Sequence, residues 1–300
     1  MSKQPSAIDR VVMFPSHWPL ADALVRSLGL PVVDYTHHRF PDRESMFRIN
    51  TDVSGARLLL IADLHDPDPH FLQLALLSET LRDLGATSVG LIAPYLPYMR
   101  QDKRFNTGEG ISSRYFARMV SAHFDSLLTV DPHLHRYHAL SEIYSIPNQL
   151  VHAAATLAAW IAKSVPDAVL IGPDQESEQW VSDVAQRADV PYETLTKQRH
   201  GDEDVQVSLP HPERWQQHTP VLVDDIISSG RTMMAAVSHL REAGLAAPLC
   251  VGVHGVFAPD AIAGILKAGA KEIVTTNTVP VETGRIDMSG AIASALRSSV

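Results

Sequence analysis

Short apolar runs alternate with amphipathic stretches along most of this 300-residue chain. LLLIAD at 58–63 is typical of a buried strand, FLQLALLSETLRDLG at 71–85 has the spacing of a helix that ends at glycine, and VGLIAPY follows as another strand. The same order returns later in VLVDD, MMAAVSHLREAG and LCVGVHGVF. Strands that alternate with helices in this way indicate parallel sheets with helices on both faces.

The repeated order indicates two units of one kind. The helix ends LRDLGA and LREAGL lie roughly 160 residues apart, which suggests a duplicated α/β unit. We expect an N-terminal domain over 8–150 and a C-terminal domain over 151–300, with the last segment able to pack on the N-terminal domain. The polar stretch from Leu195 to Pro220 predicts either a mobile loop or an exposed hairpin.

Composition excludes several classes of function. The net charge of -9 argues against a broad nucleic-acid-binding face. No segment is apolar over the length of a membrane span, and the first residues lack the apolar core of a signal peptide, so we expect a cytoplasmic protein. The single cysteine, Cys250, lies in an apolar run and is expected to be a buried, inert thiol.

The stretch VLVDDIISSGRT at 221–232 places two acids after an apolar run and a hydroxyl-rich turn after the acids. The turn Ser228-Ser229-Gly230-Arg231-Thr232 opens a helix, so its backbone N–H groups favour an anion. Carboxylates repel a phosphate, and Asp224 and Asp225 would therefore face a neutral diol. A pentose phosphate offers both groups. The alternative is that Asp225 or Ser228 only caps the helix.

These residues resemble the phosphoribosyl-pyrophosphate (PRPP) loop of the type I phosphoribosyltransferase fold. The resemblance implies that the turn, with Ser228, Ser229, Gly230 and Thr232, holds the phosphate of a pentose phosphate. It also implies an α/β fold of two tandem phosphoribosyltransferase-like domains, each a mostly parallel sheet flanked by helices. The loop alone does not separate transferases, which consume PRPP, from the diphosphokinases that make it.

Two further motifs resemble ribose-phosphate diphosphokinases. APYLPYMRQDKRF at 93–105 is similar to PYxxYxRQDR, and HHRFPDRES at 37–45 is similar to RFSDGE, with Arg43 in place of the glycine. The resemblance implies that these segments bind ATP across a subunit boundary, in a homo-oligomer between dimer and hexamer. The implied ATP-binding residues are Phe40, Asp42, Glu44, Arg100, Gln101, Asp102 and Arg104.

Two strand-end motifs imply a magnesium site. TVDPHLHRYH at 129–138 resembles TVDLH, whose histidine contacts the magnesium of the nucleotide, and His133 takes that place. LIGPDQESEQW at 170–180 resembles SPDxGG, so Asp174 would lie near the ribose phosphate and the metal, while Glu176 and Ser177 replace the glycines. The histidine pattern H-x-H-x-x-H also permits zinc, but nucleotide phosphates favour Mg²⁺.

Lys197 and Arg199 lie in the polar stretch between the Asp174 motif and the PRPP loop. Two cations on such a loop could stabilise the diphosphoryl group in transfer. The resemblance assigns them to a catalytic loop, whereas the alternative is a solvated surface.

The motifs together imply a ribose-phosphate diphosphokinase that makes PRPP and AMP from ATP and ribose 5-phosphate. A phosphoribosyltransferase and a non-catalytic regulatory paralogue remain as alternatives. The segment VSGARLLLIADLHDP lacks the arginine and the QST-like run of phosphate-activated members, so we expect altered or absent control by phosphate and ADP. Oligomer size and nucleotide preference stay open.

Overall fold

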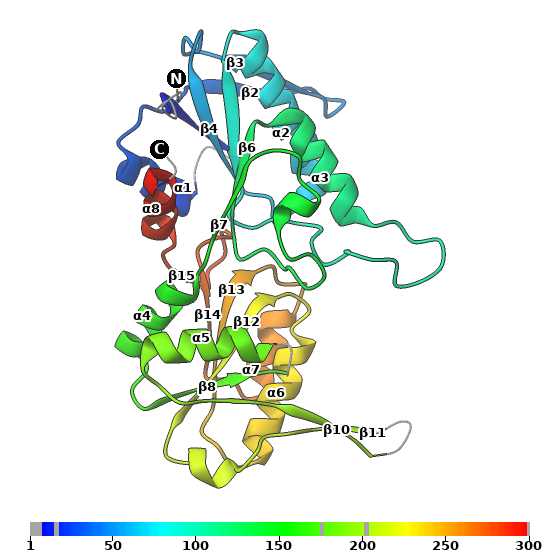
Figure 1. Cartoon of the computed structure of the whole chain (residues 1–300), viewed down its shortest axis with the longest axis vertical. Coiled ribbons are helices and arrows are strands. Elements are labelled where there is room, and N and C mark those ends of the chain that lie inside the picture. Colours follow the sequence, from blue (N-terminus) through cyan, green and yellow to red (C-terminus); the bar gives the residue numbers. More distant parts are fainter. Residues whose placement is uncertain (1–7, 15–17, 175–176, 201–203, 299–300) are drawn as a thin grey trace. The chain divides into compact units, whose positions relative to one another are not determined.

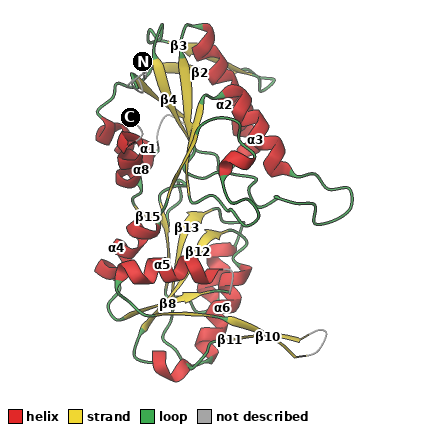
Figure 2. Ribbon diagram, in the orientation of Figure 1, coloured by secondary structure: helices red, strands yellow, loops and turns green. Residues whose placement is uncertain are grey.

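The computed structural model describes residues 8–14, 18–174, 177–200 and 204–298. The chain divides into two compact units, one of Met1–Val151 with Ser289–Val300 and the other of His152–Met288. Each unit is built on a parallel sheet between layers of helices (Figures 1 and 2). The expected fold class, two α/β units with mostly parallel sheets, is therefore confirmed.

The first unit contains a five-stranded parallel sheet. Its strands are, in spatial order, β1 (Arg10–Phe14), β4 (Arg57–Ala62), β5 (Ser88–Ile92), β6 (Ser126–Val130) and β7 (Asn148–Val151). Helices α1 (Pro19–Leu28) and α8 (Ser289–Ser298) cover one face, and α2 (Pro67–Asp83) and α3 (Ser112–His123) cover the other (Figure 2). A separate antiparallel hairpin joins β2 (Tyr35–Arg39) to β3 (Ser45–Ile49), and a short 3-10 helix, η1, spans Leu140–Glu142.

Local sequence explains how α2 is placed. Leu58 and Leu60 of the preceding strand β4 are fully buried, because both faces of this sheet are covered. The helix begins at Pro67, four residues before the expected Phe71. Proline is favourable at the first helical position, because the backbone N–H that it lacks would have no partner within the helix. Gly85 follows its end with a φ of 99°, a conformation that glycine adopts without strain.

The last helix belongs to the first unit. In α8, Ile292 and Ala293 are fully buried, and the helix packs against α1 and β7. The side chain of Gln149 in β7 donates a hydrogen bond to the carbonyl of Ala295 at 3.0 Å. Figure 1 shows α8 beside α1, so the ends of the chain meet in one unit.

The second unit contains a six-stranded parallel sheet. Its strands are, in spatial order, β15 (Gly284–Ile286), β14 (Glu272–Thr276), β13 (Leu249–Gly255), β12 (Thr219–Ile227), β8 (Ala168–Gly172) and β9 (Tyr192–Thr194). The helices are α4 (Ala154–Ser164), α5 (Glu178–Ala188), α6 (Arg231–Glu242) and α7 (Ala261–Lys267), and η3 (Pro212–Trp215) is a 3-10 turn.

Several sequence-based expectations can be compared with this unit. The alanine-rich stretch 153–162 forms most of α4, whose Leu157 and Ile161 are fully buried. The polar stretch from Leu195 contains the antiparallel hairpin of β10 (Thr196–His200) and β11 (Asp204–Ser208), which is the second of the two expected alternatives. Cys250 is fully buried in β13, and burial raises the pKa of its thiol to about 12. No helix in the described ranges is long and apolar enough to cross a lipid bilayer.

Candidate active site

The hairpin β2–β3 presents three of the residues expected to bind ATP. Phe40 follows β2 with 42% of its surface exposed, and its ring packs edge-on against His38. The turn is closed by two backbone bonds of 2.8 Å: the Phe40 N–H donates to the Glu44 carbonyl, and the Arg43 N–H donates to the Phe40 carbonyl. The Asp42 carboxylate accepts the N–H of Glu44 at 3.1 Å. An exposed aromatic ring beside two acids is therefore held on a defined turn.

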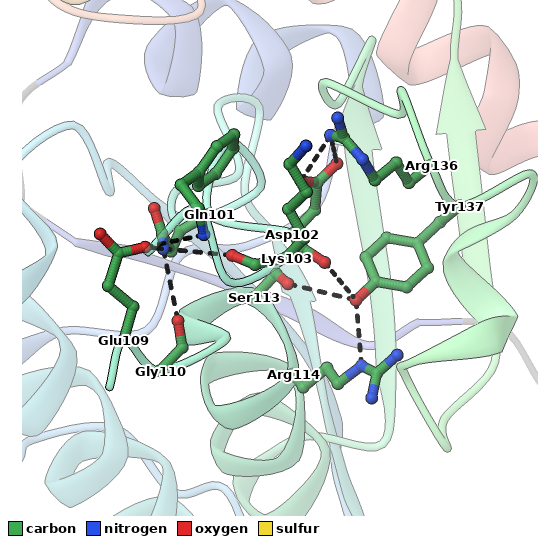
Figure 3. Close-up of polar contacts among 10 residues, drawn as sticks. Gln101, Asp102, Lys103, Glu109, Gly110, Ser113, Arg114, Arg136 and Tyr137 are labelled. Atoms are coloured by element: carbon green, nitrogen blue, oxygen red, sulfur yellow. Dashed lines mark hydrogen bonds and ion pairs between the residues drawn. The ribbon is translucent and has the colours of Figure 1, made fainter. Parts of the chain in front are cut away.

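The cluster that follows β5 is built around Gln101 and Glu109 (Figure 3). The Gln101 side-chain amide lies within hydrogen-bonding distance of the Lys103 carbonyl, the Gly110 carbonyl and the Glu109 carboxylate. The same carboxylate accepts the backbone N–H groups of Phe105 and Asn106 at 2.8 and 3.0 Å. These bonds lower the pKa of Glu109, led by the bond from the Asn106 side chain.

Asp102 has a different environment from the one expected of an ATP-binding residue. Its side chain is 3% exposed, and Arg136 donates to both carboxylate oxygens from one nitrogen, at 2.8 and 3.0 Å (Figure 3). The carbonyl of Asp102 also accepts a long bond from the Tyr137 hydroxyl. The carboxylate thus fixes Arg136, whose guanidinium remains half exposed and lies over the Phe105 ring.

A hollow of about 510 Å³ lies beside this cluster. Its lining includes Arg104, Arg114, Arg118 and two tyrosines. Arg104 donates through Nε to the Glu109 carbonyl, and Arg114 donates through Nε to the Tyr137 hydroxyl. The three guanidinium groups outnumber the one lining carboxylate, Glu142, so the hollow has a net positive lining that suits an anionic ligand.

His133 lies on the loop after β6 and is half-buried. Its ring meets that of His135 edge-on, with 4.0 Å between ring centroids. Within the described residues, no group of three or more histidine, cysteine, aspartate and glutamate side chains is placed to hold a metal ion.

The acid pair of the second unit lies inside β12, not at its end as expected, because β13 continues to pair with β12 as far as Ile227. The neighbour on the other side, β8, pairs only as far as Leu222. The pair therefore lies beyond the carboxyl end of β8, the side on which open parallel sheets bind ligands.

Electrostatic repulsion is concentrated at this pair. Burial, followed by the charge of Asp225, raises the pKa of Asp224 well above its usual range, and Asp174 adds to the effect. The N–H of Asp225 donates to the Asp224 carboxylate at 3.0 Å. Asp174 follows β8 and accepts the N–H of Ser177 at 3.2 Å. The charges of Asp225 and Asp174 thus both raise the pKa of Asp224. A ligand with hydroxyl donors, or a cation, would relieve this repulsion.

The turn after β12 has the geometry of an anion site. Gly230 has a φ of 70° and precedes α6, whose fourth residue, Met234, donates its N–H to the Gly230 carbonyl at 2.7 Å. A Cβ at Gly230 would lie 3.0 Å from a methyl of Ile265, so both conformation and space favour glycine. Ser229 and Thr232 are exposed and Ser228 is half-buried, and no acid lies in the first turn of α6.

Lys197 and Arg199 lie on β10 of the hairpin, but their side chains fall outside the described part of the chain. Glu176 also lies outside it. Sequence reasoning did not assign Arg136 or Glu109 to the site. The signal for Arg136 was its place among the polar residues after β6, but its partner Asp102 is 34 residues away and no local pattern joins them.

Comparison with known proteins identifies the family. A family model described as the N-terminal domain of ribose phosphate pyrophosphokinase matches residues 10–123, and one described as the phosphoribosyl transferase domain matches residues 139–285. A ribose-phosphate pyrophosphokinase of Sulfurisphaera tokodaii is 32% identical over 90% of this chain and 94% of the relative. The chain belongs to the ribose-phosphate pyrophosphokinase family. This confirms the resemblance inferred from the motifs.

Other members of the family are comparably similar. A ribose-phosphate pyrophosphokinase of Methanopyrus kandleri is 31% identical over 93% of this chain and 95% of the relative. The fold resembles the crystal structure of phosphoribosylpyrophosphate synthetase from Mycobacterium smegmatis, with a TM-score of 0.84, 24% identity, and 98% and 99% of the two chains covered. The relatives span both units, so the match extends well beyond the PRPP loop.

Proposed function

We propose that this chain transfers the β,γ-diphosphoryl group of ATP to the C1 hydroxyl of ribose 5-phosphate and releases PRPP and AMP. The observation that carries the proposal is membership of the pyrophosphokinase family over nine tenths of the chain. The acid pair and anion turn of the second unit and the cationic cluster of the first supply the groups that this reaction needs.

The second unit holds ribose 5-phosphate in this proposal. Backbone N–H groups of the turn 228–232 and the hydroxyls of Ser228, Ser229 and Thr232 bind the 5-phosphate, and Gly230 lets the backbone approach it. Asp224 and Asp225 accept the ribose hydroxyls. The raised pKa of Asp224 fits this role, because hydroxyl donors offset the repulsion within the acid pair.

The first unit holds ATP. Phe40 stacks on the adenine, with Asp42 and Glu44 beside it, while Arg100, Gln101 and Arg104 contact the base and the phosphates. Asp102 takes part by fixing Arg136, whose half-exposed guanidinium is a further cation for the triphosphate. Arg136 is an addition to the residues expected from the sequence.

In the reaction, the anomeric oxygen forms a bond to the β-phosphorus as the bond from that phosphorus to the oxygen bridging to the α-phosphate breaks. AMP leaves with the bridging oxygen, and the hydroxyl proton passes to solvent. Lys197 and Arg199 stabilise the charge on the diphosphoryl group, and positioning supplies most of the remaining acceleration. His133 and Asp174 would hold Mg²⁺, which neutralises phosphate charge when bound.

Assembly and location follow from the family resemblance. The adenine site implied by the RFSDGE-like hairpin is completed by a second subunit, so we propose a homo-oligomer between dimer and hexamer. We also propose that the protein works in the cytoplasm without nucleic-acid or membrane partners.

A non-catalytic regulatory paralogue is the second candidate, because Glu176 and Ser177 replace the glycine pair of the SPDxGG motif. Ser177 donates its hydroxyl to the carbonyl of Asp174 at 2.6 Å, so the segment is closed by a side chain that glycine would lack. Such a paralogue would bind nucleotide without releasing AMP.

The deciding experiment is AMP formation from ATP, Mg²⁺ and ribose 5-phosphate, beside the double variant Lys197→Ala, Arg199→Ala. We expect AMP from the natural protein and a loss of at least about a hundredfold in the variant, as when charge-stabilising groups are removed from other enzymes. A folded natural protein that binds ATP but forms no AMP would overturn the proposal in favour of the regulatory paralogue.

A further inference from the structure

A buried carboxylate lies at the carboxyl end of β4, in the segment 53–67 that lacks the QST-like run of phosphate-activated members. Asp63 follows the strand directly, and its side chain is 2% exposed. Burying a carboxylate is costly unless partners compensate for the lost water. The partners of Asp63 therefore indicate why the acid is there.

Both carboxylate oxygens of Asp63 are used by one residue, His65. One oxygen accepts the His65 backbone N–H at 3.1 Å, and the other lies 2.7 Å from Nδ1 of the imidazole. A carboxylate only accepts hydrogen bonds, so Nδ1 carries a proton and donates it. The ring is thereby oriented, and its Nε2 has no hydrogen-bond partner among the residues that the structure describes.

The electrostatic surroundings of His65 favour its charged form. The hydrogen bond to Asp63 raises the pKa of the imidazole above its ordinary value, burial opposes this, and the charges of Asp63 and Asp66 add to the increase. From α2 the ring of His70 faces it, with 6.2 Å between centroids. The His70 Nδ1 is buried and has no hydrogen-bond partner within the described residues.

The Asp63–His65 pair lies at the same edge of the first sheet as the start of the segment assigned to ATP. β4 and β5 are neighbours in the sheet, so the residues after them share one edge. Asp68, in the first turn of α2, accepts a hydrogen bond from the hydroxyl of Tyr98, two residues before Arg100. The loop that carries His65 leads directly into α2, and α2 is thus hydrogen-bonded to the segment that carries Arg100.

A purely structural role explains this pair poorly. A turn would need only the bond from the backbone N–H of His65. The bond to Nδ1 orients a ring that is 40% exposed, and a carboxylate paired with a half-exposed partner contributes little net stability. A buried acid that orients a histidine is instead a recurring feature of sites in which the imidazole acts on a ligand.

We propose that His65, oriented by Asp63, binds a phosphate oxygen of the nucleotide through Nε2–H and is a further binding residue of the ATP site. This inference rests on the proposed function, because it takes the carboxyl edge of the first unit as the nucleotide site. Because Asp63 keeps a proton on Nδ1, Nε2 carries a proton only in the charged imidazolium, so the bond to phosphate requires the charged form. Because the pKa of His65 is raised, its imidazole is fully charged at low pH and loses this charge as the pH rises through the folded-state pKa. We therefore expect nucleotide affinity to fall as the pH rises.

The test is calorimetric titration of the full chain with Mg²⁺ and α,β-methylene ATP, which is not cleaved, between pH 6 and 8.5. For His65→Gln we expect about tenfold weaker binding at pH 6 and convergence with the natural protein at high pH. The steady-state KM for ATP should rise by the same factor with kcat unchanged. Comparing variants at one pH removes the titration of the nucleotide itself.

His123→Gln is the matched control. His123 also lies next to an acid, with Nδ1 2.9 Å from Glu79, but that pair joins α3 to α2 away from the strand ends. The control should match the natural protein at every pH. Asp63→Asn should move the pH dependence to lower pH, but a buried substitution can unfold the protein, so His65→Gln decides the question.

The outcomes separate the two proposals. Equal affinity of a folded His65→Gln variant and the natural protein across the whole pH range would overturn the assignment of His65. If the natural protein forms no AMP while His65→Gln still weakens analogue binding at low pH, the reaction proposal fails and the binding role of His65 stands.

Discussion

At the scale of single residues, Arg43 shows a substitution that the backbone does not favour. It stands where the family motif has glycine, and its φ is 75°, in the left-handed region. The turn is kept because Phe40 bonds to both Arg43 and Glu44. The turn has thus been retained with a residue that is strained in it.

Arg43→Gly should therefore stabilise the protein. Removing the left-handed strain of Arg43 should raise the free energy of unfolding by about 1–2 kcal/mol. The greater freedom of glycine in the unfolded chain should lower it by about 0.5–1 kcal/mol. We expect a net gain of up to about 1 kcal/mol in the free energy of unfolding, measured in urea. Arg39→Gly in β2, where the backbone is extended, is the control and should lower stability. A loss of stability in Arg43→Gly as well would contradict this account.

At the scale of elements, the segment 101–110 is a loop held by its own side chains. The Glu109 carboxylate accepts bonds from Gln101, Phe105 and Asn106, and its carbonyl accepts the Nε–H of Arg104. Two of the proposed ATP-binding residues, Gln101 and Arg104, thus bond to one half-buried acid. The acid organises the loop without belonging to the hydrophobic core.

Glu109→Ala should weaken nucleotide binding more than it weakens the fold. We expect the Kd for Mg²⁺ and α,β-methylene ATP to rise about three- to tenfold, because the loop must be ordered again on binding. The thermal unfolding midpoint should stay nearly unchanged. Asp83→Ala, which removes the same charge from an exposed position on α2, is the control. Unchanged affinity in Glu109→Ala would show that the loop does not need this carboxylate.

At the scale of the whole molecule, the first unit is assembled from both ends of the sequence. α8 contributes Ile292 and Ala293 to its core and follows the entire second unit in the chain. Its packing against α1 and β7 should therefore set the stability of the first unit, although α8 lies far from the motifs of that unit in sequence.

Ile292→Asp should destabilise the first unit selectively. An unpaired charge replaces a fully buried side chain, and we expect a loss of at least about 3 kcal/mol in the free energy of unfolding. Hydrogen exchange should rise in α1 and β7 before it rises in the second unit. Ser294→Asp, on the exposed face of α8, is the control. Equal protection of α1 in the two variants would contradict the role of α8.

The sequence predicted the sheets better than the smaller elements, for a physical reason. Parallel strands buried on both faces read as continuous apolar runs, as LLLIA does in β4. Strand β2 is mostly exposed and polar, β3 buries only Phe47, and β9 and β15 have three residues each, so none of these gives a usable period. The predicted start of α2 was wrong because the residues from Pro67 to His70 are prolines or polar residues, so the apolar spacing of the helix begins only at Phe71.

The motifs indicated which segments form the site, and the structure adds how their side chains are held. Asp102 was assigned to ATP from its place in a motif, yet its carboxylate is occupied by Arg136. The pairing depends on how loops after different strands meet, which no local pattern contains. The Asp63–His65 pair is close in sequence, but only burial distinguishes it from an ordinary polar turn.

The return of α8 to the first unit has a consequence for synthesis. A ribosome makes the five strands of the first sheet early in synthesis. It makes α8, which covers one face of that sheet together with α1, only after residue 288. Until then α1 and β7 expose apolar surface, while the whole second unit, His152–Met288, can already fold. The nascent first unit should therefore be the part that chaperones protect, and the second unit should be the first to resist proteolysis.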